Sequence, residues 1–275
     1  MSQNPLKQFF RQPKIYIGLP SHGIYNKPGT IQGDIERMPV YGMTGMDDIL
    51  MKTPDALLLG ESTVTVVESC CSSITNAWDI CTLDIDVILT AIRIATYGNI
   101  MRVLHDCPNC RAENEYELDL SKLIDHYASC KYENKIIMSD IGVTIKPLTY
   151  RQSTDFAIRN FQLQQQLSQA VTIEDADEKK QVLADMFQKL AILQNEILAE
   201  SIESVDIGTS AVTEKPYIKE WLDNCDKSVT EKIRSQIQQN QTTWATPKHQ
   251  VACSECQTQS NIAVDLDQST FFANA

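Results

Sequence analysis

Two C-x2-C cysteine pairs stand far apart in this chain and are followed by nearly the same sequence. Each begins the pattern C-x2-C-x8-D-L, which ends at Asp119-Leu120 in the first copy and at Asp265-Leu266 in the second. Between the cysteines and the Asp-Leu pair, every second residue is apolar: Tyr116, Leu118 and Leu120, then Ile262, Val264 and Leu266. A period of two predicts a half-buried strand after each cysteine pair.

The spacing of the cysteines predicts a structural zinc site. Two C-x2-C turns supply four tetrahedral ligands, here Cys107, Cys110, Cys253 and Cys256. Four thiolates leave no coordination position for a catalytic water, so we expect Zn²⁺ to hold the fold as a zinc ribbon. Disulfides and unligated thiols remain alternatives. His105 and His249 precede the two pairs and would replace a cysteine or hydrogen-bond to one, but a four-cysteine site makes both unnecessary.

Composition fits a soluble protein made in a reducing compartment. The chain has 275 residues, 43% of them apolar, enough for one large domain or two small ones. The N-terminal sequence MSQNPLKQFFRQPK lacks the apolar run of a signal peptide, and Arg93 interrupts even the apolar stretch 87–95. Of the nine cysteines, five lie outside the pairs, and we expect them to be core thiols: Cys70, Cys71, Cys81, Cys130 and Cys225.

Charge argues against nucleic-acid binding. The net charge is −12, whereas nucleic-acid binding depends on Lys and Arg that neutralise phosphates. A short basic arm carries Lys7, Arg11 and Lys14 beside Phe9-Phe10, and we interpret it as a docking tail or a solvated terminus. A zinc-ribbon nucleic-acid module is therefore only a remote alternative.

The pattern of elements predicts an α+β protein that is mainly helical, with a small zinc-ribbon β element and a long inserted helical hairpin. We expect a mixed α/β region at 1–100 and a zinc ribbon split between 101–120 and 250–275. A strand pair and helical hairpin region at 121–249 is inserted between the two halves of the ribbon. The metal would thus close a very long loop.

In the first region, residues 14–17 predict a strand that ends at Gly18. Further elements are a turn at Thr53-Pro54-Asp55, a helix capped by Thr44, a helix or strand at 64–74, and a core helix from Asp84 or Asp86 to Gly98. The next helix is expected at 121–127.

In the inserted region, two strands within 136–148 should join at 139–142 and lead into a helix near Ser153 or Thr154. After a polar break at 174–177, a longer helix ends near Gly208, with Leu183, Leu190 and Ile197 at heptad spacing. Helices are then expected at 216–225 and 228–239, the latter with a capping box formed by Ser228 and Glu231.

Three stretches resemble a known family. They are Leu19-Pro20-Ser21 with Tyr25 and then MPVYGMTGMDD at 38–48, AIRIATYG at 91–98, and Pro247-x-His249-x3-Cys253-x2-Cys256 running to Phe271-Phe272. In these residues the chain is similar to the baseplate hub proteins of T-even-like contractile-tailed phages. Residues 142–149, GVTIKPLT, also resemble segments of phage tail assembly chaperones that hold the tape-measure protein.

The resemblance implies a viral protein that binds other baseplate hub proteins and the tape-measure protein during tail assembly. It would act in the host cytoplasm, and as a hub component it would remain in the virion tail baseplate. A tape-measure chaperone absent from the mature virion is the alternative, and self-association stays open. The chain shows no H-E-x-x-H, G-x-S-x-G or phosphate-loop pattern, so we do not expect an enzyme.

Overall fold

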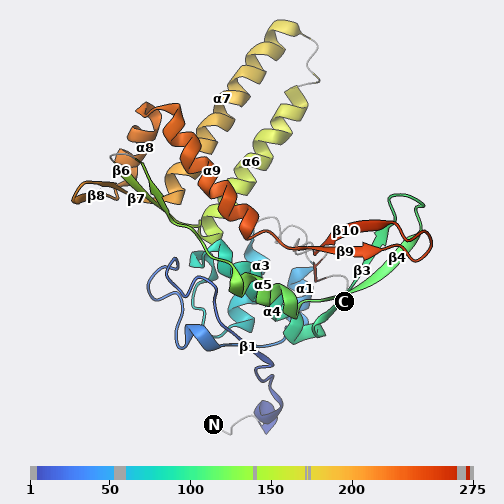
Figure 1. The fold of residues 1–275 in the computed structure, drawn as a ribbon. Helices are drawn as coiled ribbons and strands as arrows, with labels where there is room; N and C mark the ends of the chain where they lie inside the picture. The colour runs from blue at the N-terminus through green and yellow to red at the C-terminus, as the bar shows by residue number, and fades with distance from the viewer. Residues whose placement is uncertain are drawn as a thin grey trace. The chain divides into compact units, whose positions relative to one another are not determined.

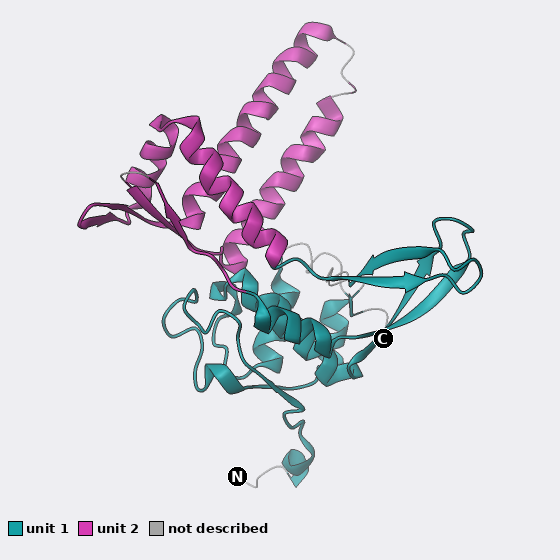
Figure 2. Cartoon of the chain, viewed as in Figure 1, with its two compact units in different colours: residues 1–130, 244–275 teal, residues 131–243 magenta. Residues whose placement is uncertain are grey.

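The computed structural model describes residues 5–52, 60–138, 141–170, 172, 175–264 and 271–272. It is 51% helical and 20% strand, which confirms a mixed fold of helices and sheets. The chain forms two compact units, one of residues 1–130 and 244–275 and the other of residues 131–243 (Figure 2). The expected turn at Pro54, the junction at 139–140 and the second Asp-Leu pair lie outside the described residues.

The first unit contains helices, small antiparallel strand pairs and short 3-10 turns (Figure 1). Its helices are α1 (Gly45–Met51), α3 (Glu61–Cys70), α4 (Thr82–Tyr97) and α5 (Ser121–Ser129). The 3-10 turns are η1 (Pro5–Phe9), η2 (Ile35–Arg37) and η3 (Ala77–Asp79), and strand β1 (Ile15–Ile17) pairs with β2 (Met38–Val40). The stretch 64–74, left open as helix or strand, is therefore helical as far as Cys70, where α3 ends.

Helix α4 is the buried centre of this unit. Ile88, Ile92 and Ala91 have no solvent exposure, and even Arg93 is only 1% exposed. The Arg93 guanidinium donates a 2.5 Å hydrogen bond from Nη1 to the backbone carbonyl of Phe271, which gives this buried cation a polar partner in the core. The cation that interrupts the apolar run of this helix thus fastens the C-terminal segment to it.

The start of α4 differs from the expected position. The helix begins at Thr82 rather than at Asp84 or Asp86. Asp84 does not act as the cap because its buried carboxylate accepts hydrogen bonds from the backbone N–H and hydroxyl of Ser21, at 3.0 and 2.5 Å. Asn26 adds a third hydrogen bond at 2.8 Å, so Asp84 organises the glycine-rich loop that follows β1.

The N-terminal arm is anchored by its central arginine. Arg11 donates to the carbonyl oxygens of Ser69 and Gly42, at 2.6 and 2.8 Å, and lies 3.3 Å from the carboxylate of Asp47. Asp47 also completes a capping box of α1 with Thr44, the residue that was predicted to cap this helix. Arg11 is therefore a structural residue and not a free docking charge, although Phe9 and Phe10 are exposed.

Two β-hairpins complete the first unit. Strand β3 (Ile100–Asp106) pairs with β4 (Glu113–Asp119), and β9 (Lys248–Ala252) pairs with β10 (Gln259–Ala263); both pairs are antiparallel. The strands after the cysteine pairs, β4 and β10, were predicted. The strands before them were missed: β9 carries few apolar residues, and the four apolar residues of β3 do not alternate with polar ones, so both strands gain their definition from pairing.

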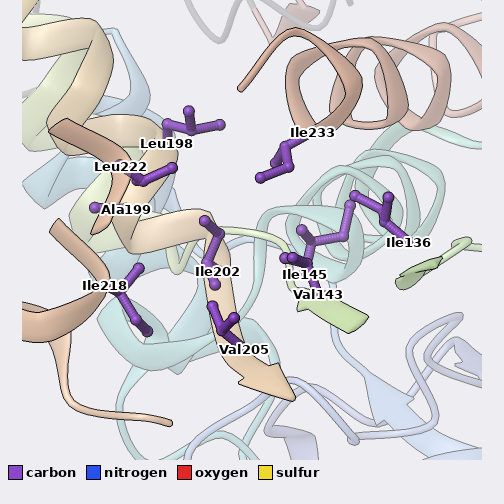
Figure 3. Close-up of a cluster of buried hydrophobic side chains, with 10 residues drawn as sticks. All are labelled: Ile136, Val143, Ile145, Leu198, Ala199, Ile202, Val205, Ile218, Leu222 and Ile233. Atoms are coloured by element: carbon purple, nitrogen blue, oxygen red, sulfur yellow. The ribbon is translucent and has the colours of Figure 1, made fainter. Parts of the chain in front are cut away.

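The second unit is a four-stranded antiparallel sheet with helices. The strand order is β5-β6-β7-β8, formed by Lys135–Ile137, Ile141–Ile145, Ile202–Ile207 and Ser210–Val212. The helices are α6 (Tyr150–Ala170), α7 (Ala176–Ser201), α8 (Lys215–Asn224) and α9 (Lys227–Thr243). Figure 3 shows the core of this unit, in which buried aliphatic side chains from β5, β6, β7, α7, α8 and α9 meet.

The prediction that the long helix ends near Gly208 is wrong. Helix α7 ends at Ser201, and β7 begins at once and pairs with both β6 and β8. Gly208, with φ +59°, forms the turn between β7 and β8. Helical periodicity continued past Ser201 in the sequence, but sheet pairing decides the backbone there, and the buried Ile202 and Val205 face the core.

The heptad residues of α7 share their helix face with residues that are more deeply buried. Met186 and Leu193 are buried in the α6–α7 pair, whereas Leu183, Leu190 and Ile197 are half-buried and flank them. The two helices run side by side and antiparallel (Figure 1), and Arg159 on α6 bonds Glu196 on α7 at 2.6 Å. The predicted hairpin is therefore present, and Met186 and Leu193 are more buried than the three residues at heptad spacing.

Two helix starts also differ from the predictions. Helix α6 begins at Tyr150, three residues before Ser153, because Thr149 and Gln152 cap its first turn reciprocally. Helix α9 begins at Lys227, so Ser228 lies within its first turn and is not its N-cap.

Candidate metal centre

The turns of the two hairpins in the first unit bring the four predicted cysteines together. The Sγ atoms of Cys107, Cys110, Cys253 and Cys256 all lie within 4.8 Å of one another. Cys107 and Cys110 occupy the turn between β3 and β4, and the other two occupy the turn between β9 and β10. Residues that are more than 140 positions apart in sequence thus form one cluster.

The two turns have the same backbone conformation. Arg111 and Gln257, each directly after the second cysteine of its pair, adopt left-handed φ angles of +60° and +58°. Each turn closes with a hydrogen bond back to its first cysteine, from Arg111 N–H to the Cys107 carbonyl and from Gln257 N–H to the Cys253 carbonyl, at 2.9 and 3.0 Å. The repeated sequence therefore encodes a repeated local structure.

Distances between the sulfur atoms suit a metal tetrahedron. The Sγ atoms of Cys107 and Cys256 are 3.6 Å apart, as are those of Cys110 and Cys253. A disulfide requires about 2.05 Å. Four thiolates about 2.3 Å from a tetrahedral zinc ion lie about 3.8 Å from one another. The cluster therefore fits Zn²⁺ in spacing, in ligand type and in ligand number.

Several hydrogen-bond donors approach the sulfur atoms. The Cys256 thiol donates to the hydroxyl of Thr258 at 3.1 Å, a bond in which the hydroxyl becomes the donor once the thiol ionises. The amide groups of Asn109 and Asn114 lie 3.6 and 3.5 Å from Cys256 and Cys253. Such donors stabilise thiolates, the form that binds metal.

Thiol pKa values in the cluster diverge. Hydrogen bonding from Thr258 lowers the pKa of Cys256 to about 5, and the Cys256 backbone amide lowers that of Cys253. The Ala112 amide acts to lower the pKa of Cys110, but contacts with the neighbouring thiols, Cys256 first, outweigh it and raise that pKa to about 12. Crowded thiols resist losing all their protons unless a cation neutralises them, which is what a bound divalent metal does.

Neither histidine joins the cluster. In the described part of the chain, the metal-ligand group at this place consists of the four cysteines alone. His105 lies on β3 opposite Asn114, and His249 lies on β9 opposite Ile262.

Sequence reasoning missed two residues that join the hairpins. Asn114 is 6% exposed and bonds the turn that carries Cys253, while the Tyr116 hydroxyl bonds the Ala252 carbonyl at 3.1 Å. The sequence contained a signal that could have identified Asn114: it is a polar residue on the same inward strand face as Tyr116 and Leu118. The alternating exposure of β4 confirms that face.

The five remaining cysteines divide into two groups. Cys70, Cys71 and Cys81 are buried as expected, and burial raises the pKa of Cys70 to about 11. Cys130 and Cys225 are only partly buried.

None of the helices in the described ranges has both the length and the apolar character needed to cross a membrane. No curated protein and no solved structure matches the chain. A family model described as T4 bacteriophage base plate protein matches residues 46–273, which include all four cysteines, the whole second unit and the first unit from residue 46. The chain therefore belongs to the T4 bacteriophage base plate protein family.

Proposed function

We propose that the protein is a structural and assembly component of the phage baseplate hub, which binds other hub proteins and the tape-measure protein. The observation that carries this proposal is the family match over residues 46–273. Its place of action would be the host cytoplasm during tail assembly and then the baseplate of the virion.

A zinc ion would act as a structural clasp within the first unit. Cys107, Cys110, Cys253 and Cys256 would hold it, and four protein ligands leave no open position for substrate or water. The ion supplies binding energy that becomes folding energy. The two hairpins, which form a split zinc ribbon in this proposal, bring together the chain segments on either side of residues 131–243.

The α6–α7 hairpin is the element that we assign to partner binding. From residue 160 to residue 170, α6 has no charged side chain, and Phe161 on α6 and Phe187 on α7 are 62% and 59% exposed. Protein interfaces are depleted of charged residues at their centres and enriched in aromatic residues. A groove of about 260 Å³ also lies between the helices, lined by Leu163, Ile192 and Leu193 among others.

A pull-down with the full chain tests this assignment. We expect the double substitution Phe161→Ser and Phe187→Ser to reduce recovery of the tape-measure or hub proteins at least tenfold. The matched control is Tyr217→Ser on α8, which removes an equally exposed aromatic ring, 63% exposed, from the same unit. Unchanged recovery with the double variant would exclude the hairpin as the contact.

A tape-measure chaperone that leaves before maturation is the second candidate. The GVTIKPLT segment favours it, and it spans most of β6 and leads to α6. Mass spectrometry of purified virions distinguishes the two roles, because a hub component is present in them and a chaperone is absent.

A nucleic-acid role has less support. The net charge is −12, and Arg11 of the basic arm already bonds Asp47, Ser69 and Gly42. A mobility shift at physiological salt should therefore show no binding.

A further inference from the structure

Asn114 connects the two hairpins beside the cysteine cluster. It lies on β4, and its side-chain amide carries both a donor and an acceptor. The oxygen accepts hydrogen bonds from the backbone N–H and from the hydroxyl of Ser254, both at 2.9 Å. The nitrogen donates to the carbonyl of Ala112 at 2.8 Å and approaches Cys253 Sγ at 3.5 Å.

These contacts join one buried amide group to three residues that belong to the two cysteine turns. Ala112 belongs to the first cysteine turn, whereas Cys253 and Ser254 belong to the second. Because Asn114 is 6% exposed, water competes little for its hydrogen bonds, and losing one would leave a buried polar atom unsatisfied.

The contacts also make the site asymmetric. The two turns repeat each other in backbone, yet the residue in the second copy that corresponds to Asn114 is Ser260, on β10. Cys253 is the first cysteine of the second pair. Among the described residues, it is the first cysteine of a pair to which a side-chain amide, that of Asn114, donates a hydrogen bond. The exposed Asn109 instead approaches Cys256, the second cysteine of its pair, at 3.6 Å.

We propose that Asn114 is a positioning residue for the metal centre: it docks the second cysteine turn onto the first hairpin and orients the Cys253 thiolate toward the ion. The inference rests on the proposed metal site. An N–H···S hydrogen bond draws charge from a thiolate and holds its direction, and partners of metal ligands typically contribute 10- to 100-fold to metal affinity.

The substitution Asn114→Asp separates the two contributions of the amide. An aspartate of the same shape keeps an oxygen that can accept from Ser254. It replaces the donor toward Cys253 and toward the Ala112 carbonyl with a negatively charged oxygen, which repels both. Asn114→Ala removes both contributions, and Asn261→Ala is the matched control, because it removes an exposed amide on β10 that lies outside the two cysteine turns.

Zinc affinity of the full-length protein is measured by competition with a chromogenic chelator, and the cobalt-substituted protein supplies a spectroscopic readout. We expect Asn114→Asp and Asn114→Ala to weaken zinc binding about 10- to 100-fold. We also expect the thiolate-to-cobalt charge-transfer band to move to lower energy, because a thiolate without its hydrogen bond donates charge more readily. Asn261→Ala should stay within about threefold of the unaltered protein.

The outcomes distinguish this inference from the proposed site. If the unaltered protein binds no zinc, the metal site itself is overturned, and the role of Asn114 with it. If the unaltered protein binds zinc and both Asn114 variants match it in affinity and in the cobalt band, only the role of Asn114 is overturned. A loss of affinity with an unchanged cobalt band would show a purely structural residue and would also overturn the inference.

Discussion

The hydroxyl group of Tyr116 on β4 donates a 3.1 Å hydrogen bond to the backbone carbonyl of Ala252 on β9. This bond joins the two hairpins one residue before Cys253, and it does not involve the proposed metal. The first cysteine turn and the second are thus linked both by their sulfur atoms and by ordinary hydrogen bonds.

Removing this hydroxyl tests its share in holding β9. We expect Tyr116→Phe to increase hydrogen exchange at 250–253 and to reduce the free energy of unfolding by about 0.5–1.5 kcal/mol. The control is Tyr16→Phe on β1, a residue that is 53% exposed and lies outside the two hairpins. Equal exchange in both variants would contradict a role for the bond.

Metal content is the most direct prediction for the cluster. Elemental analysis of the purified chain should find about one zinc per molecule, and Cys107→Ser or Cys253→Ser should lose both the metal and stability, because binding energy is folding energy. Cys225→Ser is the control, since this partly buried thiol lies outside the cluster. If the chain folds fully without metal, the proposal that a zinc ion stabilises the first unit is wrong.

Arg93 should be essential to the first unit. Arg93→Met keeps much of the side-chain volume but leaves the Phe271 carbonyl without its charged donor, so we expect a loss of about 2–3 kcal/mol in the free energy of unfolding. Arg102→Met, which removes an exposed arginine near Glu115 and Glu117, should cost less than about 1 kcal/mol. Urea denaturation compares the two, and equal midpoints would refute the anchoring role of Arg93.

Asp86 on α4 gives the first unit a pH dependence. Burial raises the pKa of Asp86 to about 6, so the folded protein holds this proton more tightly than the unfolded chain does. The stabilising contribution is therefore present below about pH 4 and is lost as the pH rises through about 6.

Substituting Asp86 removes that dependence. We expect Asp86→Asn to raise the free energy of unfolding at pH 7.5 by about 1–2 kcal/mol relative to its effect at pH 4. Asp125→Asn on α5 is the control, because this carboxylate is exposed. Parallel pH profiles for the unaltered and Asp86→Asn proteins would contradict the raised pKa.

Lys215 should stabilise the end of α7. Its ammonium group donates to the carbonyls of Ala199, Glu200 and Ile202 at 2.7–3.0 Å, and burial lowers its pKa. Lys215→Met leaves these carbonyls without a donor, and we expect a loss of about 1–3 kcal/mol with faster hydrogen exchange at 198–202. Lys219→Met, half-exposed on α8, serves as the control and should change neither measurement.

Much of the fold could be predicted from local patterns. The capping residues around Thr44, the period-two alternation after each cysteine pair and the apolar periodicity of α4 predicted the elements that formed there. Short, polar strands such as β9 escaped prediction because neighbouring strands, and not their own residues, define them. The end of α7 was mispredicted for the same reason, because pairing with β6 and β8 defines the strand that follows it.

The sequence by itself determined the chemistry of the cluster. The repeated C-x2-C spacing identified four thiols as one group, because two residues between cysteines suffice to turn both side chains to the same side. Only the tertiary structure decided that the two turns meet, with their sulfur atoms 3.6 Å apart, and which neighbours support them. Asn114, Tyr116 and Arg93 act on partners more than 130 residues away, and the separation leaves no local signal of the pairing.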